Sequence, residues 1–599
     1  MDSMKKIVLL LLILAATTAV AGTIWLVRLS DQVDSGAGPA MDSAQTSLES
    51  STTSFLPADA VAMIRFSDLG QGLELLERSP LGRSLAGIDI PKVMRAMGAS
   101  EQEVSRVRQV MNSGEWRIWK KLLVNLFGQE TLIGYVPDRK QGPASSSGPE
   151  FIFAEGLVAV CRPEQGAALW SLVSSFIPGL EQKQVRAFQG QSIRELVLDQ
   201  DLNLYHCSID GYLLLSMEPG SLVRLLKVRN GQVPSLVQVE RFRQEWNRVS
   251  GDLALAFVNG KGLQTLLNDL QKANGAHQAS EAGLPGFRSA VFGWARSGPG
   301  LFEQTGTIDL IPERLTPAQR TFLGSKPEDP RPFLGMAPRG TNLLIWQGNF
   351  DPAALWPGSG QPDSDLDSQM QDVFGRDWER FKSRLDGQAG TLFRDMASTA
   401  MFPVPEWAFF LQAKNQDRLM SAMVRSVLQQ VHQATGLDLP VRRVKEQGLE
   451  LEQVVLPFGE ALRPSWARIG EYEVWATNQG LLEDIWAVSS GGECLAAETR
   501  FSEVGTPLVQ PGHGFQFIQV DACLEMLRTA LVWAGDMALA TRLQGERAAR
   551  LKVIRDELMH PVLDGLQMFE TAALWTIMNP ERLNVKGLLS TVTLELGPE

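Results

Sequence analysis

Residues 185–216 read VRAFQGQSIRELVLDQDLNLYHCSIDGYLLLS, and this stretch decides the fold class. Short, partly alternating stretches of apolar and polar residues follow one another, with a Gly-bearing turn at Gly190 and a polar connection at 199–203. This pattern predicts strands joined by hairpins. Strands that follow one another directly pair antiparallel, because a parallel pair needs a long crossover. The stretch therefore predicts mostly antiparallel sheet covered by helices, the α+β class.

The rest of the chain repeats this arrangement. Tyr212 and Tyr472 align in two similar strands, and Gly220 and Gly480 follow each strand at the start of a helix. Six pairs of blocks recur in the same order, which indicates an internal duplication; the alternative is a chance recurrence of common strand–helix patterns. We expect two homologous halves, at residues 55–325 and 335–599, joined by a Pro-rich linker at 326–334. The paired blocks begin at residues 57 and 338, 155 and 406, 185 and 441, 210 and 470, 251 and 513, and 290 and 571.

An apolar segment precedes these halves. Lys5 and Lys6 are followed by an uncharged run from Ile7 to Val27, long enough as a helix to span about 30 Å. Residues 1–28 are therefore predicted to form a signal-anchor transmembrane helix in a bacterial inner membrane. The preceding lysines place the N-terminus in the cytoplasm and the bulk of the chain in the periplasm. A signal peptide cleaved after 19–21 (Ala-Val-Ala) is the alternative, and would leave the body secreted or periplasmic. Residues 29–54, rich in Ser, Thr and Gly, form a predicted flexible tether.

The sequence after the tether resembles a known family. Leu56–Leu69, LPADAVAMIRFSDL, follows an export segment and is similar to the opening of an uncharacterised bacterial family of membrane-anchored extracytoplasmic proteins. Asp210–Ser216, DGYLLLS, resembles the same family. The family is classed only as a domain of unknown function, so the resemblance implies location and architecture but no activity, and it assigns no catalytic residue.

Composition excludes several partners and cofactors. The net charge is −12, from 56 basic and 68 acidic residues, which argues against nucleic acid. The segment 259–262, Asn-Gly-Lys-Gly, lacks the spacing of a phosphate loop and is interpreted as a turn from a strand into a helix, so no nucleotide is expected. The segment 199–203 lacks the Gly and the Glu of a calcium loop. We therefore assign no catalytic, cofactor-binding or metal-binding residue.

Histidine and cysteine offer few candidates for chemistry, with five and four residues respectively. His206 is interpreted as an ordinary strand residue, and His513 as a residue of a turn or strand edge. The pairs Cys161–Cys207 and Cys494–Cys523 are left open between one disulfide per half and buried free thiols.

Two amphipathic segments combine aromatic and basic residues. Residues 115–127 predict a helix with Trp116 and Trp119 on one stripe, and Trp378, Phe381 and Leu385 form a comparable stripe in the second half. Such helices can lie on anionic bilayers, but a single apolar stripe most often packs on the protein's own sheet. Packing in the core is the preferred interpretation.

These features predict a non-enzymatic protein of the cell envelope that binds or scaffolds other envelope components. A protein partner is the default, since related halves commonly pack as a pair. One alternative is a carrier of lipid or another hydrophobic ligand, in a groove between the halves. The other alternative is an envelope enzyme whose active site is assembled from distant residues.

Overall fold

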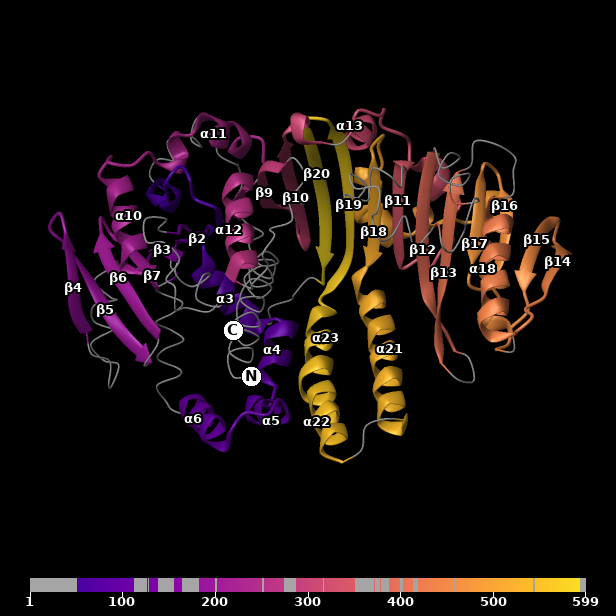
Figure 1. The fold of residues 1–599 in the computed structure, drawn as a ribbon, viewed down its shortest axis with the longest axis horizontal. Helices are drawn as coiled ribbons and strands as arrows, with labels where there is room; N and C mark the ends of the chain where they lie inside the picture. Colours follow the sequence, from indigo (N-terminus) through magenta and orange to yellow (C-terminus); the bar gives the residue numbers. More distant parts are fainter. Residues whose placement is uncertain are drawn as a thin grey trace. The chain divides into compact units, whose positions relative to one another are not determined.

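The computed structural model describes two compact units, the first ending at Asp309 and the second spanning Leu310–Val592 (Figure 1). The predicted membrane segment and residues 29–50 of the predicted tether lie outside the described residues. The prediction is wrong for residues 51–54, because Ser51, Thr52 and Thr53 are buried and Thr52 begins a 3-10 helix held by Glu130. None of the described helices is both long enough and apolar enough to cross a bilayer. The described residues are 51–112, 127, 129–137, 156–163, 182–199, 202–249, 251, 253–273, 287–315, 317–350, 371, 378, 387–398, 402–412, 419–456, 458–541 and 545–592.

The first unit is built on a sheet with the strand order β4-β5-β6-β7-β3-β2-β1-β8-β9-β10. Neighbours from β4 to β9 are antiparallel. The strands are β1 (Ala62–Phe66), β2 (Glu130–Tyr135), β3 (Leu157–Arg162), β4 (Gln182–Phe188), β5 (Gln191–Asp199), β6 (Leu202–Ile209), β7 (Tyr212–Ser216), β8 (Ala254–Asn259), β9 (Phe287–Gly298) and β10 (Leu301–Leu310). The helices are η1 (Thr52–Phe55), α3 (Leu69–Arg78), α4 (Pro80–Ala86), α5 (Ile90–Ala96), α6 (Glu101–Asn112), α10 (Pro219–Arg229), η2 (Leu236–Gln238), α11 (Glu240–Trp246) and α12 (Gly260–Ala273).

The second unit has the strand order β14-β15-β16-β17-β13-β12-β11-β18-β19-β20, with every neighbouring pair antiparallel. The strands are β11 (Leu343–Phe350), β12 (Gly387–Ser398), β13 (Pro403–Gln412), β14 (Val441–Glu446), β15 (Leu449–Val454), β16 (Ser465–Ile469), β17 (Tyr472–Ala476), β18 (Gly514–Gln519), β19 (Phe569–Asn579) and β20 (Arg582–Thr591). The helices are η3 (Pro312–Arg314), α13 (Pro317–Leu323), α14 (Arg331–Leu334), α18 (Leu419–Thr435), η4 (Glu460–Leu462), α19 (Gln479–Ser489), η5 (Leu495–Ala497), α20 (Thr499–Val504), η6 (Thr506–Leu508), α21 (Val520–Thr541), α22 (Glu546–Ile554), the π-helical η7 (Arg555–Met559) and α23 (His560–Leu566).

The prediction of antiparallel sheet with covering helices is confirmed, and the two units share one strand order. Local details agree as well. The first strand of each sheet follows an isolated bridge, Pro57 to Ser235 in one unit and Pro338 to Cys494 in the other. In both units a helix follows the strand that begins at Tyr212 or Tyr472, then a short 3-10 helix, then a further helix.

Equivalent turns explain why the sequence patterns matched. Gln189 and Gly190 have φ values of 47° and 83°, and Gln447 and Gly448 have 48° and 86°. Two consecutive positive φ values define the tight hairpin turn whose twist suits antiparallel strands. The β4–β5 and β14–β15 hairpins therefore share one turn type.

Some of the paired blocks need adjustment. The alignment of Pro57 with Pro338 makes Ala62 the counterpart of Leu343. The structure agrees, because Ala62 pairs with Val258 on β8 and Leu343 pairs with Ile518 on the equivalent strand β18. The last block is displaced by one residue, because Asn259 lies opposite Ser289 whereas Gln519 lies opposite Thr571. Ser289, not Ala290, is therefore the counterpart of Thr571.

The boundary between the units differs from the predicted linker. Residues 310–334 pack with the second unit, since Phe322 and Leu323 form a small buried cluster with Leu315, and Phe333 and Leu334 are buried. Glu328 also forms a backbone bridge to Gly512 in this unit. Apolar side chains recur through this stretch, and their burial outweighs the turn-forming tendency of its prolines.

Each unit has its own core. In the first unit Phe242 packs edge-on against Phe257, with ring centroids 5.1 Å apart. In the second unit Phe501 lies 5.0 Å from Phe517. Phe242 and Phe501 are each only 1% exposed, so both helices α11 and α20 are anchored to their sheets by a buried aromatic ring.

Candidate binding site in the second unit

A cavity of about 750 Å³ lies against one end of the second unit's sheet, beside the N-terminus of α18. Cross-strand pairing places Arg443, Glu452 and Trp466 in one row on the face that α18 covers. Opposed residues of neighbouring strands point to the same face, so the hairpin itself creates a charged wall beside an aromatic floor. The cavity is lined by Met420, Ser421, Arg443, Val444, Lys445, Gly448, Leu449, Glu450, Leu451, Glu452, Trp466, Ala467, Arg468, Glu473 and Trp486.

The wall is organised around the carboxylate of Glu452, whose side chain is 6% exposed. Arg443 Nε lies 2.8 Å from Glu452 Oε1, and Arg425 of α18 approaches the same oxygen at 3.5 Å. Burial raises the pKa of Glu452, but hydrogen bonds from Arg443 and Ser421 and the charge of Arg425 outweigh it and lower the pKa. Two arginines, both more than half exposed, thus share one buried anion and present cationic edges to the solvent.

The floor is held by hydrogen bonds to α18. Trp466 is 3% exposed, and its indole Nε1 donates to Ser421 Oγ at 3.0 Å. The buried carboxylate of Glu473 accepts from the backbone N–H of Met420. The first N–H groups of a helix lack partners within the helix, so this contact caps α18 and favours negative charge there. At the rim, Lys445 Nζ lies 3.8 Å from Glu450 Oε1.

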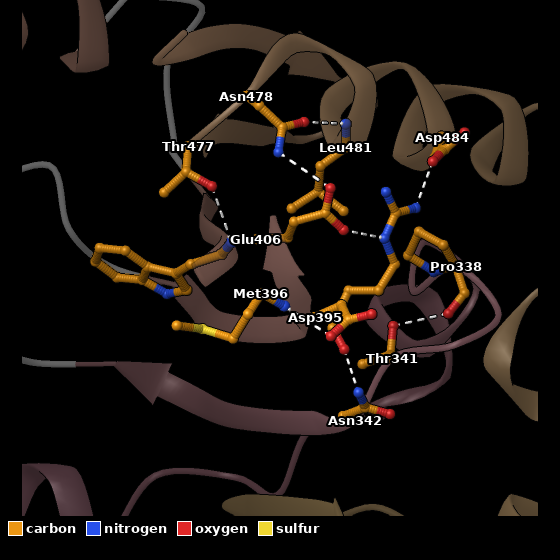
Figure 2. A network of polar contacts seen from close by, with 12 residues as sticks. Pro338, Thr341, Asn342, Asp395, Met396, Glu406, Thr477, Asn478, Leu481 and Asp484 are labelled. Carbon is orange, nitrogen blue, oxygen red and sulfur yellow. Dashed lines mark hydrogen bonds and ion pairs between the residues drawn. The ribbon is translucent and has the colours of Figure 1, made fainter. Parts of the chain in front are cut away.

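A second polar cluster fixes α19 to β12 and β13, two strands that do not line the cavity. Arg394 on β12 places Nε 2.7 Å from Glu406 Oε2 on β13 and also pairs with Asp484 on α19 (Figure 2). Asn478 caps α19 by accepting from Leu481 N at 2.8 Å, and its amide donates to Glu406 at 3.3 Å. The hydrogen bonds and ion pairs of this cluster join β12 and β13 to the start of α19, so the cluster has a structural role.

In the first unit the equivalent helix position carries the opposite charge, and its ion-pair partner comes from a different segment of the chain. Arg224 on α10 pairs with Asp59 and donates to the backbone carbonyl of Pro137 at 2.7 Å. Arg224 occupies the helix position of Asp484, twelve residues after the aligned tyrosine in each unit. The helix is held in the same place by opposite chemistry, so the ion pair serves attachment and not a shared reaction.

The first unit also buries two carboxylates together. Glu245 and Asp309, with side chains 2% and 4% exposed, both pair with Arg241. Ser289 Oγ donates to Glu245 at 3.1 Å. Burial and a hydrogen bond to Asp309 raise the pKa of Glu245, although the hydrogen bond from Arg241 opposes them. Such a pair could exchange a proton, but both carboxylates are buried too deeply for a substrate to reach them.

The residues considered from the sequence have mainly structural environments. Asn259 ends β8, and its Oδ1 accepts from the backbone N–H groups of Lys261 and Gly262 at 3.1 and 3.3 Å, as in a turn that starts a helix. His513 is fully buried directly before β18. Its Nδ1 accepts from Met578 N at 3.2 Å and its Nε2 lies 3.1 Å from Ser325 O. Burial lowers the pKa of His513 and lowers that of His206 to about 4.

All four cysteines are free thiols. Cys161 lies on β3 and Cys207 on β6, on opposite sides of β7, so two inter-strand spacings separate them and a bridge is out of reach. Trp378 is buried in a cluster with Ala389 and Leu411, which agrees with core packing at this residue. The other residues of that stripe, and the stripe of Trp116 and Trp119, lie outside the described residues.

No group of His, Cys, Asp and Glu among the described residues could hold a metal ion. The cavity residues themselves were not singled out from the sequence, although a signal was present. In a two-residue hairpin centred on 447–448, opposed residues have numbers with a constant sum, which pairs Arg443 with Glu452 and Lys445 with Glu450. The missing element was the helix that closes over them.

Comparison with known proteins adds no relative. No protein family, no curated protein and no solved structure matches the chain. The function proposed below therefore depends on the residues and geometry of this chain.

Proposed function

We propose that the chain is a membrane-anchored, extracytoplasmic binding protein of a bacterial envelope, and that its second unit binds a protein partner in the cavity beside α18. The cavity is the observation that carries this proposal. Its size is within the range of ligand sites, and it combines an aromatic floor with charged groups of both signs. In this proposal the anchor is the segment Ile7–Val27 and the tether is residues 29–50, since residues 51–54 belong to the folded first unit.

The lining favours a polypeptide over a lipid. Three basic and three acidic side chains line the cavity, counted from its lining residues as Arg443, Lys445, Arg468, Glu450, Glu452 and Glu473. An acyl chain would remove water from these charges without replacing their hydrogen bonds, which is costly. A peptide segment offers both its own charges and backbone donors and acceptors, and can stack on the partly exposed Trp486.

The same lining supports binding without catalysis. Glu452 is held by Arg443, and Glu473 caps α18. Each buried acid of the cavity therefore already has a structural partner. A general acid or base needs a proton it can exchange with a substrate, and a carboxylate whose pKa is lowered by arginine is poorly suited to that task.

We infer further that the two units descend from one module by duplication, and that the resemblance to a membrane-anchored extracytoplasmic family reflects the same architecture. The shared strand order, the equivalent bridges at Pro57 and Pro338, and the matching hairpin turns support this inference. The opposite charges at Arg224 and Asp484 fit a pair of modules that diverged in chemistry while keeping their packing.

The test is site-specific photocrosslinking in cells. A crosslinking amino acid replaces Lys445 at the rim of the cavity, and a matched variant carries it at Arg442, three residues earlier on β14, which points to the opposite face of the strand. We expect a discrete protein adduct from position 445 that position 442 does not give, and its loss when Arg468→Glu reverses a charge of the lining. Equal adducts from both positions, or lipid adducts from position 445, would overturn the proposal.

A further inference from the structure

The connection between β18 and β19 in the second unit is a helical hairpin that extends beyond the strands it joins (Figure 1). One arm is α21, and the other runs without interruption through α22, η7 and α23. Ion pairs link the arms, Arg528 with Asp564 and Arg555 with Asp536. The hairpin is therefore a defined structure and not an irregular loop.

The first two segments of the second arm, α22 and η7, do not pack into the core, whereas α23 buries Leu563. No residue of α22 is buried, and none of η7 is buried. Leu551, Val553 and Ile554 are nevertheless apolar and remain only half-buried. On the facing arm, Trp533 is 37% and Met537 is 42% exposed. A helix stabilised by packing normally buries an apolar stripe, so the two arms carry apolar side chains that the described residues of the unit leave partly exposed, although Trp533 also contacts Phe402.

The first part of this arm, α22, has the charge opposite to that of the chain, whereas Asp556, Glu557 and Asp564 in η7 and α23 bring the whole arm to neutrality. Within α22, Arg547, Arg550 and Lys552 are exposed, and Glu546 is the single acid. Glu546 pairs with Arg550, which leaves a net positive segment on a protein whose net charge is −12. Exposed basic residues interleaved with half-exposed aliphatic ones are the pattern of helices that lie in the interface of anionic bilayers.

The tether between the proposed anchor and the folded body keeps that body close to the bilayer. The tether, residues 29–50, extends at most about 75 Å, and as a flexible chain it spans about 25 Å on average. A body held at that distance meets the bilayer repeatedly at high effective concentration, so even weak interfacial affinity becomes effective.

We propose that the α21–α23 hairpin docks onto the anionic lipid surface of the membrane in which the chain is anchored, with Arg547 and Lys552 binding lipid phosphates and Leu551 and Ile554 entering the headgroup boundary. The proposal rests on the proposed membrane anchor. The hairpin acts as a second, reversible contact that orients the second unit relative to the bilayer, and the bilayer is its occupant, not a protein.

The test uses the full chain reconstituted into lipid nanodiscs. A bimane label at Ala549→Cys on α22 reports contact with the bilayer through quenching by lipids brominated on their tails. We expect quenching in discs containing phosphatidylglycerol and at least fivefold less in discs of phosphatidylcholine alone. Arg547→Glu with Lys552→Glu should abolish the quenching. Arg248→Glu with Lys261→Glu, the same charge change at exposed residues of the first unit, should preserve it.

The outcomes separate this inference from the function on which it rests. A label that stays unquenched while the chain remains integrated in the discs refutes the hairpin contact and leaves the anchor intact. A label shielded from water but unaffected by brominated lipid indicates a protein surface, which also refutes the inference. A chain that washes out of the discs at alkaline pH refutes the anchor itself. Unlabelled variants with native circular dichroism exclude misfolding as the cause.

Discussion

Arg394→Met is expected to release α19 from the second unit's sheet. Arg394 is 24% exposed and pairs with Glu406, which is 17% exposed, at 2.7 Å. It also pairs with Asp484, which is 52% exposed. Methionine retains much of the aliphatic stem and removes only the guanidinium, so the change isolates the polar contacts (Figure 2).

The cost follows from the exposure of each partner. The hydrogen bond to the half-buried Glu406 contributes about 1.5–3 kcal/mol, because removing the cation leaves a desolvated carboxylate. The pair with the exposed Asp484 adds about 0.2–1 kcal/mol. Together these give about 2–4 kcal/mol, and the local opening equilibrium of α19 should rise roughly 30-fold to several-hundred-fold.

Hydrogen exchange of the peptide covering residues 479–489 measures this opening directly. Arg339→Met is the matched control, since Arg339 pairs with Glu493 in the same unit but both side chains are more than half exposed. The control should change exchange by less than threefold. A double-mutant cycle should give a larger coupling for Arg394 with Glu406 than with Asp484. Equal protection of α19 in both arginine variants would refute this assignment of the network.

Two further predictions concern buried groups. Because burial raises the pKa of Glu245, the folded state holds a proton that the unfolded chain releases, and this group's contribution to stability falls as the pH rises from its ordinary pKa toward the raised one. Glu245→Gln should remove that decline, so urea unfolding should favour the variant progressively as the pH rises above the ordinary pKa of a glutamate, and parallel pH profiles for the two proteins would contradict it. Phe242→Ala and Phe501→Ala should each cost about 3–5 kcal/mol in the unit that contains them, and costs differing by more than about 2 kcal/mol would argue against equivalent positions.

Most of the strands and their hairpin pairings could be predicted from the sequence. Strands that alternate in polarity and are separated by Gly-bearing turns leave few choices of pairing, so the hairpins at Gly190 and Gly448 were predictable. Where a strand pairs with one far along the chain, as β1 does with β8, the register depends on side-chain packing across the sheet. The alignment of Ala290 with Thr571 therefore missed the observed register by one residue.

The candidate site was less accessible from sequence for a physical reason. The ladder of Arg443 with Glu452 is local, but the cavity exists only because α18 places Ser421 over Trp466, forty-five residues away. Similarly, Arg241 and Glu245 lie one turn apart on α11, but Asp309 joins them only through the tertiary fold. Long-range burial of charge leaves no periodic trace in the chain.

The central claim is that the two units form an extracytoplasmic body on an uncleaved membrane anchor. Thiol labelling of Gln232→Cys, at an exposed turn of the first unit, tests it in spheroplasts with a membrane-impermeant maleimide and the parent chain as background. The account predicts labelling while the inner membrane is intact, on a chain that stays with the membrane after carbonate extraction. Labelling that appears only after lysis, or a labelled chain in the soluble fraction, would contradict it.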